Sequence, residues 1–204
     1  MKAFLIRHGI TDWNLEKRVQ GREDIELNEA GRKQAQYCAD CLAKASFDCI
    51  VSSPLSRAKE TAQIIAKWHE GVEMREMEAF IERDFGAYSG TQVNKGEIMH
   101  LGEKRDDSEI EPKPVVAKRA LLGLSELAKD FPNGNVCVIT HGGVINAVLG
   151  ELSDYRLQHL FLDNVFVTGL KEENGTFKIL DYNVSPEQFD ELQKKEQEWT
   201  EKEQ

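Results

Sequence analysis

Two histidines of the chain stand directly after short apolar runs. His8 and its neighbour Arg7 follow the run 3–6, and His141 follows the run 136–140. A neutral imidazole can act as a nucleophile. A guanidinium group beside it is a fixed cation that disfavours the charged imidazolium and attracts anions. Together these residue types indicate chemistry on an anionic group.

A second arginine extends this pattern. The apolar run 47–52 ends in Ser-Ser-Pro, and Pro54 is well placed at the start of a helix whose first turn contains Arg57. If the three runs are neighbouring parallel strands, their carboxyl ends meet at one edge of the sheet, beside helix N-termini that favour anions. We therefore expect the two histidines and two arginines to converge in one cationic pocket.

The pattern along the chain predicts the elements that must position this pocket. Strands are expected at 3–6, 47–52, 72–77 and 136–140, followed by a hairpin of 165–170 and 177–182 that turns at Asn174-Gly175. Helices are expected at 29–44 after the cap Asn28, from Pro54 onward, at 115–129 and at 144–152. Residues 10–27 are expected to form a loop. Alternation of strands and helices predicts an α/β fold, a three-layer sandwich with a largely parallel central sheet.

The 204 residues suit one domain, with 91–114 as a lid excursion rich in both charges and 186–204 as a charged tail. The formal net charge of −10 argues against nucleic acid as a partner. No run has the length of a membrane span, and the apolar start is too short for a signal peptide.

Cys38 and Cys41 lie in a helical stretch and are expected to be structural free thiols, which favours a reducing, cytoplasmic location.

The motifs around these residues resemble the histidine phosphatase superfamily, also called the phosphoglycerate mutase-like family. The resemblance spans residues 3 to about 150 in family order and rests on Leu-Ile-Arg-His-Gly-Ile-Thr-Asp-Trp-Asn at 5–14, Gln20-Gly21, Leu-Asn-Glu-Ala-Gly at 27–31, Ser-Ser-Pro-Leu-Ser-Arg-Ala-Lys-Glu-Thr-Ala at 52–62, Ile-Glu-Arg-Asp-Phe-Gly at 81–86 and Thr-His-Gly-Gly at 140–143. It implies a phosphoglycerate mutase-like sandwich and a pocket for a phosphoryl group.

The resemblance also implies roles for single residues. His8 would be the nucleophile that takes the phosphoryl group, Arg7, Arg57 and His141 would bind its oxygens, and Glu82 would be the general acid and later the base. The pocket would be completed by residues that bind substrate, namely Asn14, Gln20, Gly21 and Gly142.

A carboxylic acid near the pocket is needed to protonate a leaving alkoxide. The residues alone leave this acid open, because Asp84, Glu78 and Asp12 also lie close to the motifs, and they rank Glu82 only slightly above Asp84. The resemblance decides for Glu82.

These roles describe a histidine acid-type phosphatase, a metal-independent phosphomonoester hydrolase that works through phosphohistidine, with no cofactor and with a small phosphorylated metabolite as its partner. The first alternative is a cofactor-dependent phosphoglycerate mutase. The segment 91–114 argues against it, because acidic residues outnumber basic ones and should repel a second phosphate. The second alternative is a non-catalytic phosphate-binding module, which should have lost the nucleophile or the acid.

Two further observations bear on the family. Ser89 stands where many of its phosphatases have glutamate, which weakens assignment to the commonest phosphatase subgroups. A nucleotide-binding Rossmann domain is disfavoured, because no Gly-x-Gly-x-x-Gly follows a predicted strand. The substrate and the oligomeric state are left open by the sequence.

Overall fold

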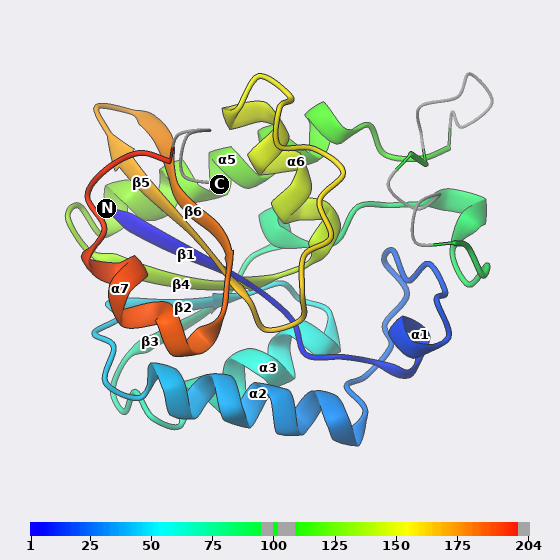
Figure 1. The fold of residues 1–204 in the computed structure, drawn as a ribbon, viewed down its shortest axis with the longest axis horizontal. Coiled ribbons are helices and arrows are strands. Elements are labelled where there is room, and N and C mark those ends of the chain that lie inside the picture. The colour runs from blue at the N-terminus through cyan, green and yellow to red at the C-terminus, as the bar shows by residue number, and fades with distance from the viewer. Residues whose placement is uncertain (95–99, 102–108, 200–204) are drawn as a thin grey trace.

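The computed structural model describes residues 1–94, 100–101 and 109–199. One sheet separates two layers of helices (Figure 1). Helices α2 (Glu29–Leu42), α3 (Ser56–Ala66) and α7 (Phe189–Lys194) lie on one face, and α5 (Lys113–Asp130) and α6 (Gly142–Leu152) lie on the other. The α/β sandwich expected from the sequence is thereby confirmed.

The sheet has the strand order β3-β2-β4-β1-β5-β6. The strands are β1 (Lys2–Arg7), β2 (Cys49–Ser52), β3 (Glu73–Glu76), β4 (Asn135–Thr140), β5 (Val167–Glu173) and β6 (Thr176–Val184). The four strands from β3 to β1 are parallel, whereas β5 runs antiparallel to β1 and β6 antiparallel to β5. The parallel part therefore brings the carboxyl ends of β1, β2 and β4 to one edge.

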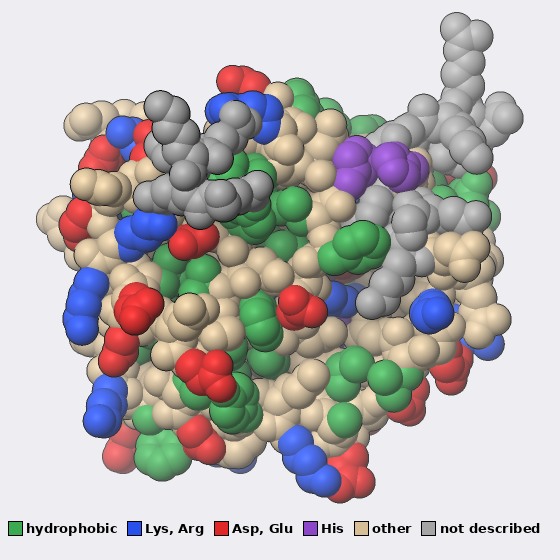
Figure 2. All heavy atoms as spheres, in the orientation of Figure 1, with side chains coloured by type: hydrophobic (Ala, Val, Ile, Leu, Met, Phe, Trp, Pro, Cys, Tyr) green, Lys and Arg blue, Asp and Glu red, His purple; other side chains and the backbone are tan. Residues whose placement is uncertain are grey.

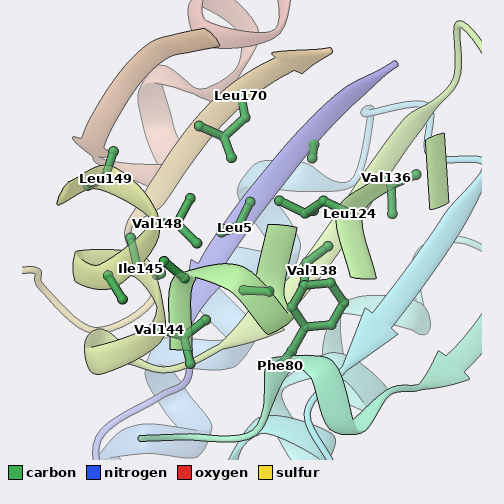
Figure 3. Close-up of a cluster of buried hydrophobic side chains, with 14 of the residues drawn as sticks. Leu5, Phe80, Leu124, Val136, Val138, Val144, Ile145, Val148, Leu149 and Leu170 are labelled. Carbon is green, nitrogen blue, oxygen red and sulfur yellow. The ribbon is translucent and has the colours of Figure 1, made fainter. Parts of the chain in front are cut away.

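The two faces of the sheet are both apolar because successive side chains of the central strands alternate between them. Ala3 and Leu5 of β1 pack towards α5 and α6, and Phe4 and Ile6 pack towards α2 and α3. Figure 3 shows the first of these cores, in which side chains of α5 and α6 meet those of β1, β4 and β5. Burial on both faces fixes the register of the strands, and with it the positions of the residues that follow them.

Local signals in the sequence account for most helix boundaries. Asn28 accepts a hydrogen bond from the Gly31 N–H and caps α2 as predicted. The helices expected from 115 and 144 start two residues earlier, at Lys113 and Gly142. The prediction of a loop over 10–27 was wrong for α1 (Asp12–Leu15), a single turn held by a capping box of Thr11 and Asn14.

The other elements within the described ranges are short 3₁₀ turns, η1 (Glu78–Phe80), η2 (Gly86–Tyr88) and η3 (Pro186–Gln188). The turn at Asn174-Gly175 joins β5 to β6 as predicted. In the tail, Phe189 and Leu192 are buried and Trp199 packs against the core. Most of the predicted lid, 95–99 and 102–108, lies outside the described residues, so its role stays a prediction.

The surface carries acidic and basic side chains interspersed with apolar ones, as Figure 2 shows for one face. In the described part of the chain, no helix is both long enough and apolar enough to cross a membrane. The four cysteines are free, and three of them, Cys38, Cys49 and Cys137, are buried.

Candidate active site

Hydrogen bonds of the sheet continue past the strand ends and set the floor of the site. Arg7 of β1 lies opposite Thr140 of β4, and the His8 N–H donates to the Thr140 carbonyl over 3.0 Å. The Ser53 N–H donates to the Ile139 carbonyl over 2.9 Å. The residues that follow β1, β2 and β4 are therefore held side by side, as expected.

The two predicted histidines face each other at this edge. The ring centroids of His8 and His141 lie 5.1 Å apart, and the Arg57 Nε–H donates to His8 Nε2 over 3.3 Å. His8 retains 2% exposure, and Arg57 and His141 are fully buried. Charged and titratable groups this deep in a protein need either partners or a ligand.

The tautomer of His8 follows from its second contact. His8 Nδ1 lies 2.7 Å from the Gly9 carbonyl oxygen, which can only accept, so Nδ1 carries the proton and Nε2 carries the lone pair. Burial and the charges of Arg57 and Arg7 hold the pKa of His8 well below 6.5, against a smaller opposing effect of the Gly9 carbonyl. The imidazole is thus neutral at physiological pH, with Nε2 available as a nucleophile.

Arg57 is fixed by the loop that follows α1. Its Nη1 and Nη2 donate to the carbonyls of Glu23 and Gly21 over 2.7 and 2.8 Å. Burial lowers the pKa of Arg57 to about 10, which leaves the group protonated at neutral pH. One turn further along α3, the Thr61 hydroxyl donates to the Arg57 carbonyl and accepts from the Gly9 N–H, which ties the helix to the loop after β1.

Arg7 and His141 each present an unpartnered nitrogen. Arg7 Nη1 donates to the Leu162 carbonyl, while Arg7 Nε is buried without a hydrogen-bond partner among the described residues. His141 Nε2 lies 2.7 Å from Ser53 Oγ, and its Nδ1 is likewise buried and unpartnered within the described chain. Burial, together with the charges of Arg57, Arg7 and Arg119, holds the pKa of His141 well below 6.5. Orphaned donors around a nucleophile suit an anion with several oxygens.

Glu82 reaches the site from the segment after η1. Its carboxylate accepts from the Arg83 N–H over 2.8 Å and from the Gly143 N–H in the first turn of α6 over 3.2 Å. The charge of Glu82 acts on both Arg7 and Arg57, raising the pKa of each against the larger lowering by burial. Glu82 therefore lies near Arg7 and Arg57, while its role as the acid stays a prediction.

The predicted substrate-binding residues are placed less uniformly. Gly142 lies against Arg7, since a Cβ built on it would be 3.5 Å from Arg7 Nε. Gly21 contacts Arg57 through its carbonyl. The buried Gln20 precedes it, and its Oε1 has no hydrogen-bond partner among the residues that the structure describes. Asn14 accepts from the Thr11 N–H and shapes the capping box of α1, so a contact with substrate stays a prediction for it.

The competing carboxylates lie elsewhere. Asp12 accepts from Asn28 at the exposed surface, Glu78 begins η1, and Asp84 accepts from the Gly86 N–H. Ser89, which stands where many family members have glutamate, lies beside Gly21. A Cβ built on Gly21 would be 3.1 Å from the hydroxyl oxygen of Ser89.

Three residues of the site were not singled out from the sequence. Ser53 and Thr61 stand inside the motif 52–62 but were given no role. Asn164 donates to the His8 carbonyl over 2.8 Å from a segment without a recognisable motif, so no signal in the sequence could have found it. Over the described ranges, no group of three His, Cys, Asp or Glu side chains is arranged to hold a metal ion.

Two arginines, two histidines and a carboxylate gathered at the carboxyl edge of a parallel sheet are the set of groups expected in an enzyme of the phosphatase and phosphomutase class. A family model of the histidine phosphatase superfamily (branch 1) matches residues 3–185. The chain belongs to this superfamily, as its motifs indicated.

Relatives and solved structures agree with this assignment. The chain is 35% identical over 187 residues to the uncharacterized phosphatase PhoE of Bacillus subtilis, covering 89% of this chain and 93% of that one. It is 39% identical over 198 residues to phosphoserine phosphatase 1 of Hydrogenobacter thermophilus, covering 91% and 93%. The mycobacterial glucosyl-3-phosphoglycerate phosphatase in complex with VO3 superposes with a TM-score of 0.79 at 27% identity, covering 90% of this chain and 99% of that one.

Proposed function

We propose that the protein hydrolyses small phosphomonoesters without a metal ion, through a phosphoryl group carried on His8 Nε2. The observation that carries this proposal is the neutral His8 ring, with Nε2 unprotonated and the cations of Arg7 and Arg57 around it. A neutral imidazole ringed by fixed positive charge combines a nucleophile with a binding site for the phosphoryl oxygens.

The cycle has two steps. In the first, His8 Nε2 attacks phosphorus, the bond to the ester oxygen breaks, and protonated Glu82 gives its proton to the leaving alkoxide. In the second, water attacks phosphohistidine, Glu82 takes a proton from that water, and the bond from phosphorus to Nε2 breaks. The products are an alcohol and inorganic phosphate, and His8 and Glu82 return to their starting states.

The other residues stabilise the charge on phosphorus in both steps. Two guanidinium N–H groups would donate to the equatorial oxygens: Arg57 Nε–H, which donates to His8 Nε2, and Arg7 Nε–H, which has no partner among the described residues. His141 would add a donor from Nδ1, and Gly142 a main-chain amide at the start of α6. Because two guanidinium groups supply the positive charge, these steps require no metal ion.

Hydrolysis is favoured over the mutase reaction by the names of the relatives, which include phosphoserine and glucosyl-3-phosphoglycerate phosphatases. The acidic charge of segment 91–114 is weaker support for hydrolysis than the sequence suggested. Glu111, one of its acidic residues, is paired with Arg119 over 2.9 Å. A small phosphorylated metabolite and a cytoplasmic location stay proposals drawn from the sequence.

The test is release of inorganic phosphate from a panel of phosphomonoesters in the presence of a chelator, with 3-phosphoglycerate assayed with and without 2,3-bisphosphoglycerate. We expect hydrolysis that the chelator does not change. His8→Ala should lose turnover by about a thousandfold or more, because the covalent route is removed. Rapid-quench labelling with a ³²P-phosphomonoester should yield acid-labile phosphoprotein in the wild type and none in His8→Ala.

Three results would contradict the proposal. Near-normal turnover of His8→Ala would show that His8 is not the nucleophile. Loss of wild-type activity in chelator would show a metal requirement. Isomerisation of 3-phosphoglycerate exceeding phosphate release would establish the mutase instead.

A further inference from the structure

Three charged side chains outside the phosphate pocket converge on the main chain that carries Glu82. Arg22 follows the Gly21 turn, Glu111 lies two residues before α5, and Arg119 lies within α5. None of the three was assigned a role in the site. Their common target is the stretch 79–84, which includes the end of η1.

Arg119 holds this stretch from the side of α5. Its Nη1 donates to the Ala79 carbonyl over 2.9 Å and its Nη2 to the Glu82 carbonyl over 3.2 Å. The same guanidinium group binds both carboxylate oxygens of Glu111, over 2.9 and 3.1 Å. Arg22 adds its Nε–H to the Glu82 carbonyl over 3.4 Å and its Nη2 to Glu111 over 3.3 Å.

Glu111 binds the same stretch at its later residues, Arg83 and Asp84. Its Oε2 accepts from the Asp84 N–H over 3.1 Å, and its own N–H donates to the Asp84 carbonyl over 2.9 Å. Its main-chain carbonyl accepts from Arg83 Nε over 2.7 Å. The residues on both sides of the Glu82 side chain are thus bound to one ion pair.

This ion pair is not of the screened surface type, since the Glu111 and Arg119 side chains are 12% and 20% exposed. Partial burial raises the pKa of Glu111. Hydrogen bonds from Arg119 and the Asp84 N–H, with the charges of Arg119 and Arg22, outweigh that effect and lower the pKa below 4.5. Glu111 is therefore a carboxylate throughout the neutral range.

We propose that the Glu111–Arg119 pair, joined by Arg22, positions the Glu82 carboxyl group so that it can give its proton to the leaving oxygen. This inference rests on the proposed function, in which Glu82 is the general acid. The pair touches neither phosphate nor leaving group in this scheme. It acts through the main chain of Glu82, whose carboxyl group must meet the Gly143 N–H and the substrate at once.

A role in protonation predicts a dependence on the leaving group that a role in stability does not. Serine and glycerol leave as alkoxides and need a proton, whereas p-nitrophenolate leaves without one. The quantity to compare is kcat/KM, which reports on transfer of the phosphoryl group to His8. Phosphoserine and β-glycerol phosphate serve as the alkyl esters, and p-nitrophenyl phosphate as the aryl ester.

The variants are Arg119→Lys, which keeps the charge but loses the forked contacts, and Arg22→Gln, at a side chain that is 42% exposed and outside the core. In Arg119→Lys we expect kcat/KM for the alkyl esters to fall about tenfold or more. The value for the aryl ester should stay within about twofold of the wild type. Arg22→Gln should show the same selectivity with a smaller loss, and thermal unfolding should confirm that each variant is folded.

Two controls separate the possible failures. Arg32→Lys alters another two-pronged pair, with Glu60 between α2 and α3, and should leave both activities unchanged. Glu82→Gln should lose about a hundredfold or more on the alkyl esters and much less on the aryl ester. If Glu82→Gln loses activity equally on alkyl and aryl esters, the proposed function is wrong in assigning Glu82 as the general acid. If it is selective but neither arginine variant is, the positioning inference alone is overturned.

Discussion

The hydroxyl of Ser53 determines which ring nitrogen of His141 carries the proton. Ser53 Oγ lies 2.7 Å from His141 Nε2 and also accepts from the Leu55 N–H over 3.3 Å. With the amide as its donor, the hydroxyl is free to donate its own proton to Nε2. The neutral ring then carries its proton on Nδ1, the buried nitrogen that lacks a partner in the described chain.

Ser53→Ala should therefore weaken phosphate binding and catalysis. Removing the hydroxyl leaves His141 Nε2 unsatisfied, at about 1–3 kcal/mol, so we expect kcat/KM to fall about tenfold. Inhibition by inorganic phosphate should weaken in parallel. Ser56→Ala is the matched control, since Ser56 Oγ has no hydrogen-bond partner in the described structure. Equal activity of the two variants would refute the role of Ser53.

At the scale of elements, the start of α6 is shaped around Glu82. A Cβ on Gly143 would lie 2.4 Å from Glu82 Oε1 and 3.2 Å from the Arg83 Cβ. Contacts below 3.0 Å do not persist, so any larger side chain at this position moves the carboxylate or the helix. Glycine is required here for close approach rather than for an unusual backbone angle.

Gly143→Ala should therefore lower kcat/KM on alkyl phosphates by about tenfold or more while the fold persists. Gly150→Ala makes the same substitution in the same helix, where the nearest atoms to the new Cβ are 3.8 Å away. That control should keep its activity and gain about 0.5–1 kcal/mol of stability from the better helix former. Steady-state kinetics and denaturant unfolding check both, and similar kinetics for the two variants would contradict the steric account.

Elements with strong local signals could be predicted from the sequence. Apolar runs located β1, β2 and β4, Pro54 and Asn28 marked the starts of two helices, and the strand ends brought Arg7, His8, Arg57 and His141 together as expected. The turn α1 was missed because four residues are too short to show a helical period.

What could not be predicted depends on contacts between distant segments. The bond from Asn164 to His8 spans 156 residues, and the contact of Glu82 with the Gly143 N–H spans 61. No local pattern encodes either one. For the same reason the residues alone could not separate Glu82 from Asp84, whereas in the fold Glu82 faces Gly143 and Asp84 faces Gly86 and Glu111.

At the scale of the whole molecule, the active site makes stability depend on pH. Burial lowers the pKa of His8, His141 and His69 below 6.5, with Arg57 and Arg7 adding to the effect for the first two. As the pH falls below 6.5, the unfolded chain binds protons at His8 and His141, whereas the folded chain keeps both rings neutral. Unfolding is then coupled to proton uptake, so the stability present above pH 6.5 is lost as the pH falls below it.

His8→Gln should reduce this acid sensitivity. Each histidine held neutral contributes a slope of about 1.4 kcal/mol per pH unit in the free energy of unfolding, once its unfolded form is protonated. Denaturant unfolding between about pH 6 and pH 5 should give a slope of unfolding free energy against pH that is lower by that amount in the variant, because glutamine does not titrate.

Saturating phosphate at constant pH provides a second comparison, since it stabilises the folded wild type by mass action and should stabilise His8→Gln less. Identical slopes for the two proteins would mean that His8 takes up its proton in the folded state, which would deprive the site of its neutral nucleophile.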